Sequence, residues 1–212
     1  MLCVVLANGN YNGNIDDYKS KISTADIIIC ADGGANFAYE TAITPTYIVG
    51  DMDSIADHVK SYYKEKGVKV KKYPKKKDFT DTQLSLMIAE EFHAIKEVVF
   101  LGTIGDRLDH TLSSIYSGIE LVNKGIKVSH FTSDLTIYIT NNKVEIDGEK
   151  GDIVSVLALS DEAKGITKTG FEYPLVNEEL QKSNPYAISN ILREERGTIQ
   201  LTDGVLAVFH YK

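Results

Sequence analysis

The chain has 212 residues, 43% of them hydrophobic, and carries a formal net charge of -7 at pH 7 with a pI near 5.3. This length can bury a substantial core as one large domain or two small ones. The negative charge argues against nucleic acid and membranes as partners, because anionic phosphate groups attract basic surfaces.

The two cysteines, Cys3 and Cys30, lie inside apolar runs and are expected to be buried thiols, as in a reducing compartment. The alternative is a single disulfide bond between them. The first ten residues lack a positively charged leader. No run of about 18 apolar residues occurs anywhere in the chain. We therefore expect a cytoplasmic protein.

The first half of the chain alternates two kinds of segment. Short runs rich in β-branched residues predict strands at 2–7, 26–31, 45–50, 68–73 and 97–102. Amphipathic segments predict helices at 54–67, 81–96 and 110–125, the last with a stripe of Leu112, Ile115, Ile119 and Val122. The alternation predicts an α/β domain over residues 1–127, with a mostly parallel sheet and helices on its faces.

The helical period disappears in the second half. Strand-like runs follow at 128–133, 135–140, 143–148, 152–159, 197–202 and 205–212, with turn signals at Asn141, Asn142 and Gly148. We expect an all-β domain over residues 128–212, a small sandwich.

Polar clusters follow four of the predicted strands in the α/β half. They read ADGGAN (31–36), GDMDS (50–54), KDFTD (77–81) and GTIGDRLDH (102–110). Ligands of open α/β sheets bind at the carboxyl ends of the strands, so we expect the four clusters to converge on one crevice.

Asp51 and Asp53 stand two positions apart at the end of a predicted strand. In extended chain their Cα atoms would be about 6.6 Å apart on one side, so both carboxylates could reach one Mg²⁺ ion. The alternative is that Asp51 belongs to a turn and that Asp53 and Ser54 cap the following helix.

In KDFTD, Asp78 and Asp81 resemble a capping box, which would explain one of them without a ligand. Asp81 on the first helical turn could instead join a metal site. The preceding lysine-rich stretch, residues 68–77, is typical of an edge strand whose charges prevent pairing with another sheet. Lys75 to Lys77 could also reach a polyphosphate.

In GTIGDRLDH, Gly102 and Gly105 permit close approach of a ligand, and the planar fork of Arg107 suits a phosphate. The alternative is a surface ion pair between Arg107 and Asp109. His110 at a helix start more often satisfies a backbone group than performs catalysis.

The paired glycines of ADGGAN precede a helix, where backbone N–H groups can face an anion. Neither G-x-x-x-x-G-K-[ST] nor G-x-G-x-x-G occurs in the chain, so a nucleotide must be held by other means. No His/Cys spacing typical of a zinc site occurs either.

These four motifs in order, followed by an all-β half with GFEYPL (170–175) and Ser189-Asn190, resemble the thiamine pyrophosphokinase family. The resemblance implies an α/β nucleotide-binding domain, a β-sandwich that binds thiamine, and a homodimer with active sites at the subunit interface. It implies transfer of the diphosphate of ATP to the hydroxyl of thiamine, which gives thiamine diphosphate and AMP.

The resemblance also assigns site residues. Magnesium would be held by Asp51, Asp53 and Asp81, which with Asp78 and Asp109 would form the catalytic set. ATP would be bound by Asp32, Gly33, Thr80, Arg107 and His110, and thiamine by Gly170, Ser189 and Asn190.

The chain departs from the family pattern in two ways. Glu172 stands where members often have lysine, and no tryptophan is present to stack on thiamine, so Tyr173 or Tyr186 would supply the aromatic face. The general base is either Asp78 or Asp109. Two other functions stay open: a phosphatase with an aspartyl nucleophile, and a sensor that binds nucleotide or thiamine without turnover.

Overall fold

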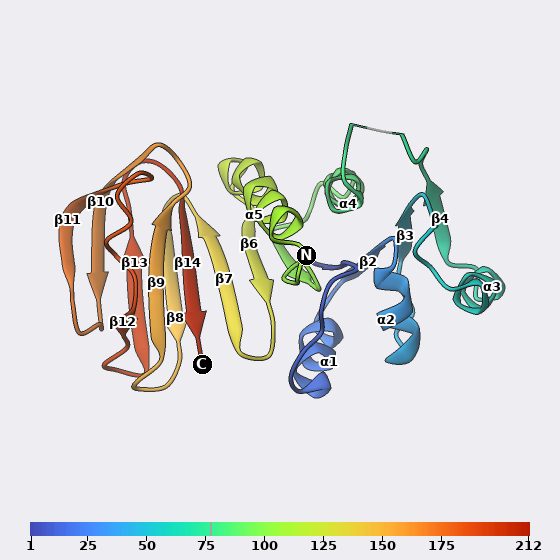
Figure 1. Cartoon of the computed structure of the whole chain (residues 1–212), viewed down its shortest axis with the longest axis horizontal. Coiled ribbons are helices and arrows are strands. Elements are labelled where there is room, and N and C mark those ends of the chain that lie inside the picture. Colours follow the sequence, from blue (N-terminus) through green and yellow to red (C-terminus); the bar gives the residue numbers. More distant parts are fainter. Residues whose placement is uncertain (77) are drawn as a thin grey trace. The chain divides into compact units, whose positions relative to one another are not determined.

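The structure is a computed structural model that describes residues 1–76 and 78–212, and it divides the chain into two compact units (Figure 1). Unit 1 comprises residues 1–114 and 130–133, and unit 2 comprises residues 115–129 and 134–212. The domain boundary predicted between residues 127 and 128 stays a prediction.

Unit 1 follows the predicted alternation of strands and helices. Its elements are β1 (Leu2–Leu6), α1 (Ile15–Ser23), β2 (Ile27–Ala31), α2 (Gly34–Glu40), β3 (Tyr47–Gly50), α3 (Asp57–Glu65), β4 (Lys69–Lys72), α4 (Asp81–Glu90) and β5 (Glu97–Leu101). Helix α5 (Leu108–Asn123) and strand β6 (Lys127–Phe131) contribute residues to both units.

The first five strands pair in the order β5-β1-β2-β3-β4, and every pair is parallel. The predicted parallel sheet is therefore confirmed, and β4, the lysine-rich strand, is its edge strand as expected. Because parallel strands share one direction, the segments that follow them leave the same edge of the sheet.

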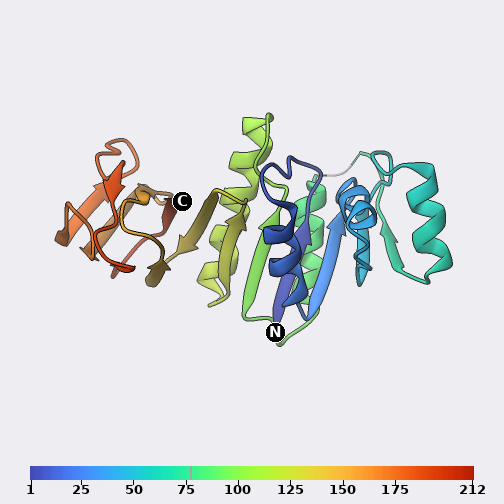
Figure 2. The ribbon, with the colours of Figure 1, turned by 90° about the horizontal axis from the view of Figure 1, so that it is seen from below.

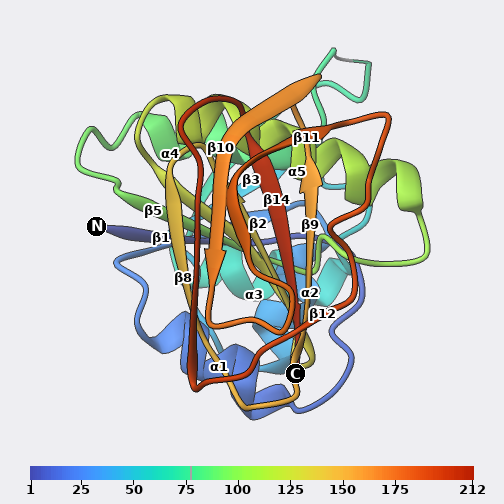
Figure 3. The same cartoon turned by 90° about the vertical axis from the view of Figure 1, so that its left-hand side faces the viewer.

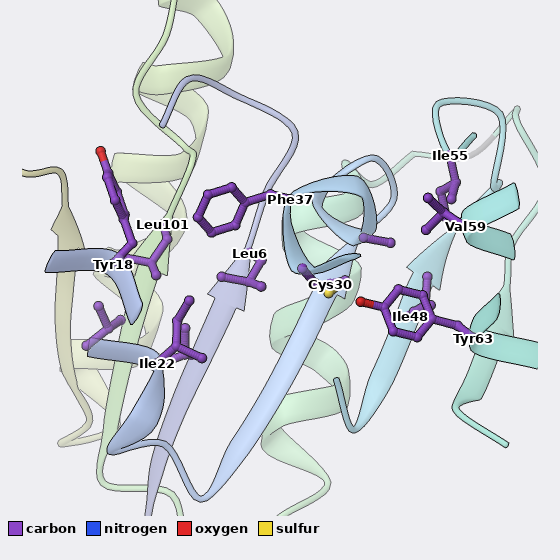
Figure 4. Close-up of a cluster of buried hydrophobic side chains, with 14 of the residues drawn as sticks. Leu6, Tyr18, Ile22, Cys30, Phe37, Ile48, Ile55, Val59, Tyr63 and Leu101 are labelled. Carbon is purple, nitrogen blue, oxygen red and sulfur yellow. The ribbon is translucent and has the colours of Figure 1, made fainter. Parts of the chain in front are cut away.

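Helices cover both faces of this sheet. Side chains of α1, α2 and α3 form one buried cluster with alternate residues of the strands, where Phe37 lies among Tyr18, Leu6 and Leu101 (Figure 4). Helix α4 lies on the opposite face, behind the strands when they are viewed from the side of α1 (Figure 2). The predicted stripe of α5 is wrong at Leu112, which is 51% exposed.

Unit 2 is all-β beyond α5 and β6. Its strands are β7 (Leu135–Thr140), β8 (Lys143–Asp147), β9 (Ile153–Ala158), β10 (Glu162–Thr169), β11 (Leu175–Gln181), β12 (Asn190–Ile191), β13 (Arg196–Gln200) and β14 (Leu206–Tyr211). They pair antiparallel in the orders β12-β9-β14-β7 and β11-β10-β13-β8. Figure 3 shows this unit with β10 and β11 toward the viewer and β9 and β14 behind them.

Residues of both sheets of unit 2, among them Val156, Ile166, Ile199 and Val208, share one core. The sandwich prediction is therefore confirmed, although β10, β11 and β12 were not predicted. No helix among the described residues is both long and apolar enough to cross a membrane.

Candidate active site

The segment after β3 folds as a tight turn. The backbone N–H of Asp53 donates to Asp51 Oδ1 at 2.9 Å, and Met52 between them has φ +70°. The predicted extended geometry is therefore wrong, because Asp51 uses a carboxylate oxygen to turn the chain.

The turn still brings carboxylates together, and it adds one from the neighbouring strand. Asp32, Asp51 and Asp53 each offer an oxygen, and these three atoms lie within 4.8 Å of one another. Asp32 follows β2 and is 5% exposed, and its Oδ1 has no hydrogen-bond partner among residues 1–76 and 78–212. Burial raises the pKa of Asp32, and the carboxylates of Asp81 and Asp51 raise it further, against hydrogen bonding from Ser54.

Asp81 approaches the same place from the start of α4. A Cβ atom on Gly50 would lie 2.9 Å from Asp32 Cβ and 3.0 Å from Asp81 Oδ1, so the glycine leaves room for both. Gly50 also has φ +145°, which favours glycine. The structure thus places four carboxylates at the ends of β2 and β3.

The helix after this turn does not use its acidic residues as caps. Helix α3 begins at Asp57 with Ala56 as its N-cap, so the predicted capping by Asp53 and Ser54 is wrong. The loop is held by Asn36 instead, whose Nδ2 donates to the Ser54 carbonyl at 2.9 Å and whose Oδ1 accepts from Ala56 N–H at 3.0 Å.

The N-terminus of α4 also differs from the prediction. Thr80, not Asp78, is the N-cap, and it forms a capping box with Gln83 through hydrogen bonds of 3.2 and 2.9 Å. Asp81 is the first helical residue and Asp78 lies exposed in the preceding loop. Capping therefore explains Thr80 and leaves both acidic residues without a capping role.

One lysine of the basic run reaches the acidic group. Lys75 Nζ lies 2.6 Å from Asp53 Oδ2, and hydrogen bonds from Lys75 and Ser54 lower the pKa of the Asp53 carboxyl. Lys77, which was expected to reach a polyphosphate, lies outside the described residues.

The segment after β5 carries the candidate phosphate-binding arginine. Arg107 makes a two-pronged ion pair with Asp109, at 2.9 Å from Nε and 2.6 Å from Nη2, and their side chains are 71% and 64% exposed. The Arg107 guanidinium holds the pKa of Asp109 well below its usual range. The structure therefore shows the surface pair that was the alternative to a phosphate site, and His110 lies exposed beside it.

A fifth strand end, after β1, contributes a loop that sequence reasoning missed. A side chain on Gly33 would collide with Asn8, and a side chain on Gly9 would collide with the Gly102 carbonyl. In the same loop, Asn10 Nδ2 donates to Asp106 Oδ1 at 3.2 Å. The signal was present, because the polar stretch NGN directly follows the first predicted strand.

In unit 2 the predicted thiamine residues lie in two segments that run side by side. The Gly170 carbonyl accepts from Arg193 N–H at 2.9 Å, and Gly170 has φ +87°. Asn190 is 3% exposed and holds the backbone of Tyr173, with Nδ2 donating to its carbonyl at 2.6 Å and Oδ1 accepting from its N–H at 3.0 Å. Ser189 is exposed, with φ +56°.

Family models match both halves of the chain. Residues 18–130 match the thiamin pyrophosphokinase catalytic domain, and residues 136–206 match the thiamin pyrophosphokinase vitamin B1 binding domain.

Relatives extend over nearly the whole chain. The thiamine pyrophosphokinase of Bacillus subtilis is 27% identical over 215 residues, with 97% of each chain covered. Thiamine pyrophosphokinase 3 of Oryza sativa is 24% identical over 84% of this chain and 75% of its own.

Solved structures share the fold. The crystal structure of the Bacillus subtilis enzyme superposes with a TM-score of 0.88 at 25% identity, with 100% of this chain and 99% of the other covered. Yeast thiamin pyrophosphokinase shares the fold at 19% identity, with a TM-score of 0.79 and coverage of 99% and 86%.

Proposed function

Because the chain belongs to the thiamine pyrophosphokinase family, we propose that it transfers the terminal diphosphate of ATP to the hydroxyl of thiamine. The thiamine oxygen bonds to the β-phosphorus, and the bond from that phosphorus to the oxygen bridging it to the α-phosphate breaks. The products are thiamine diphosphate, AMP and the hydroxyl proton. Neither a phosphatase nor a sensor finds support in these similarities.

The observation that carries the proposal is the group of carboxylates at the ends of β2 and β3. Its donors are all hard oxygen atoms, and Asp32 contributes a buried oxygen without a protein partner among the described residues, so the group fits Mg²⁺. Asp51 and Asp53 would hold the ion together with the clustered oxygen of Asp32, and Asp81 would add a further oxygen from the start of α4. A bound Mg²⁺ would neutralise charge on the phosphate oxygens.

Around this group, basic and backbone groups would bind the nucleotide. Arg107 can offer its fork to a phosphate by exchanging Asp109 for it, since both side chains are exposed. Gly33, the N-cap of α2, would offer its backbone N–H to a phosphate, and Thr80 fixes the start of α4. His110 lies in the first turn of α5, next to Arg107 and Asp109 in the sequence.

The thiamine hydroxyl proton must pass to a base. While it is paired with Arg107, Asp109 has a lowered pKa and takes up a proton poorly. When a phosphate replaces it on Arg107, Asp109 joins Asp78, which is exposed in the loop before α4, as a candidate for this role.

Thiamine would bind beside Gly170 and Ser189. Tyr173 is 65% exposed and can offer an aromatic face to the thiamine rings. Asn190 would act by holding the backbone of Tyr173, because its amide is already used there.

The proposal includes a cytoplasmic homodimer with each active site at the subunit interface. The two free, buried thiols agree with a reducing compartment. The catalytic and thiamine-binding residues lie in separate units of one chain, which agrees with a site assembled from two copies.

The test is incubation with ATP, thiamine and Mg²⁺, followed by separation of AMP, ADP and thiamine phosphates. We expect AMP and thiamine diphosphate in equal amounts. ADP together with thiamine monophosphate would show transfer of a single phosphoryl group and refute the proposal.

Asp51→Asn tests the metal role. We expect turnover to fall by roughly 100-fold or more, and the rise in melting temperature on adding Mg²⁺ to vanish. Asp57→Asn, at an exposed carboxylate of α3 paired with Lys60, is the control and should retain both. Unchanged turnover in Asp51→Asn would exclude Asp51 from the site.

A further inference from the structure

His130 is a buried titratable residue of unit 1 that the proposed reaction does not use. It lies on β6 with 0% exposure, and its ring stacks on Phe100 with the centroids 4.7 Å apart and the planes 13° apart. Burial lowers the pKa of His130 to about 3, so the ring is neutral at neutral pH.

The two ring nitrogens of His130 differ in their surroundings. Nδ1 lies 2.8 Å from the hydroxyl of Thr103, whereas the buried Nε2 has no partner within the described part of the chain. A buried nitrogen without a partner lowers stability, and a hydrocarbon side chain would avoid that loss. What the imidazole adds beyond packing is therefore its one bond to Thr103.

Thr103 lies in the loop that leads from β5 to Arg107. Its carbonyl accepts from the Thr111 hydroxyl at 3.2 Å, and that hydroxyl oxygen, Thr111 Oγ1, in turn accepts from the Gly105 N–H at 3.4 Å. The Thr111 N–H donates to the Arg107 carbonyl at 3.0 Å. The loop is thus tied from the buried end of β6 to the first turn of α5.

We propose that His130 is a positioning residue that acts through Thr103 to hold the Gly102–Arg107 loop and so sets where Arg107 presents its guanidinium to a phosphate. This inference rests on the proposed role of Arg107 in binding ATP. A loop that is held before binding loses less conformational entropy when the ligand arrives, so its release should weaken ATP binding.

Two substitutions remove the bond from either side. His130→Phe keeps a flat ring against Phe100, and Thr103→Val keeps the β-branched shape, but neither variant can form the hydrogen bond. We expect each to weaken ATP binding by about 5- to 20-fold, measured by calorimetry without thiamine, and to leave the KM for thiamine unchanged. Thr103→Ser, which retains the hydroxyl, should stay within about twofold of the parent protein.

The double variant separates positioning from general damage. Because both changes remove the same hydrogen bond, the double variant His130→Phe/Thr103→Val should have about the same ATP affinity as whichever single variant binds ATP less tightly. Thr136→Val, at a buried threonine of β7 in unit 2, is the matched control and should bind ATP normally.

Three outcomes would overturn the inference. The first is an ATP affinity in Thr103→Val equal to that of the parent protein, and the second is a loss of ATP affinity in the double variant equal to the product of the two single losses. The third is a rise in the KM for thiamine as large as the loss of ATP affinity. If His130→Phe does not fold, Thr103→Val and Thr103→Ser decide the question alone. Failure of the proposed function is distinguishable, because the unaltered protein would then bind ATP without forming thiamine diphosphate. If it does not bind ATP at all, both proposals are refuted.

Discussion

The side chain of Lys168 lies inside unit 2, where it is 2% exposed. Its ammonium group is 5.4 Å from the centre of the Phe171 ring, and no carboxylate in the residues that the structure describes forms an ion pair with it. Burial lowers the pKa of Lys168 to about 8. At neutral pH the fold therefore holds a buried positive charge that no carboxylate among the described residues neutralises.

This charge predicts a pH dependence of stability. Between pH 8 and about 10.4 the unfolded chain keeps the proton on Lys168 and the folded chain releases it, so the free energy of unfolding should rise with pH. Lys168→Met should raise the free energy of unfolding at pH 7 by about 1–3 kcal/mol. It should also abolish the contribution of Lys168 to the increase of that free energy with pH. Urea unfolding at pH 7, 8, 9 and 10 measures both effects.

Lys164→Met is the matched control on the same strand. Lys164 is exposed and paired with Glu162 at 2.8 Å, so its substitution should change the free energy of unfolding by less than about 0.5 kcal/mol. A loss of stability in Lys168→Met at pH 7 would contradict the prediction.

The sequence identified most acidic residues of the candidate site but not their geometry. Asp32, Asp51 and Asp81 could be found because each stands at a strand end or helix start. The turn around Met52 was foreseen only as the alternative in which Asp51 belongs to a turn, and the hydrogen bond from Asp53 N–H to Asp51 Oδ1 selects that alternative over extended chain. Asn36 was missed as a support for the loop, because its partners lie 18 and 20 positions along the chain.

Among the elements, the start of α4 links helix stability to the site. Thr80→Ala removes the N-cap and should lower the free energy of unfolding by about 1 kcal/mol. Because Asp81 is the next residue, the substitution should also raise the Mg²⁺ concentration needed for half-maximal activity. Thermal unfolding and a magnesium titration of activity measure the two effects.

Asn14→Ala is the control for capping alone. Asn14 caps α1 by accepting from Asp16 N–H at 3.1 Å. We expect a similar loss of stability with an unchanged magnesium dependence. If both variants shift the magnesium dependence equally, the start of α4 has no special link to the metal site.

Strands with a clear apolar pattern could be predicted, and three others could not, of which β12 has only two residues. In β11 (Leu175–Gln181) most side chains are exposed, so no alternation marks the strand. In β10 the register shifts twice, after Ala163 and after Ile166, which breaks the period of two. Helix α4 ends at Glu90, although its pattern predicted a helix to residue 96.

For the whole molecule, the change of sequence period near residue 127 predicted two kinds of architecture, and both are present. The proposed dimer would join the catalytic residues of one copy to the thiamine-binding residues of the other. We expect sedimentation of the protein at micromolar concentration to show a dimer, and a monomer would refute the shared site.

Mixing two inactive variants tests the same point. Asp51→Asn and Gly170→Val each damage a different half of the proposed site, since a side chain at Gly170 would lie 2.6 Å from the Arg196 carbonyl. After exchange of subunits, random pairing should restore about a quarter of the parental activity. No recovery, in a mixture shown to have exchanged subunits, would place each active site within one chain.

Gly9, Gly33 and Gly50 each lie so close to another segment that any side chain would displace it. Part of the surface that would face the nucleotide is therefore main chain, which presents the same N–H and C=O groups whatever the neighbouring side chains are. In evolutionary terms this surface is closed to stepwise change, because single substitutions there would displace neighbouring atoms of Gly102, Asn8 or Asp32 before they altered recognition. Descendants of this chain that accept a new nucleotide should carry their substitutions elsewhere, for example at the exposed residues 74–76, 78 and 79.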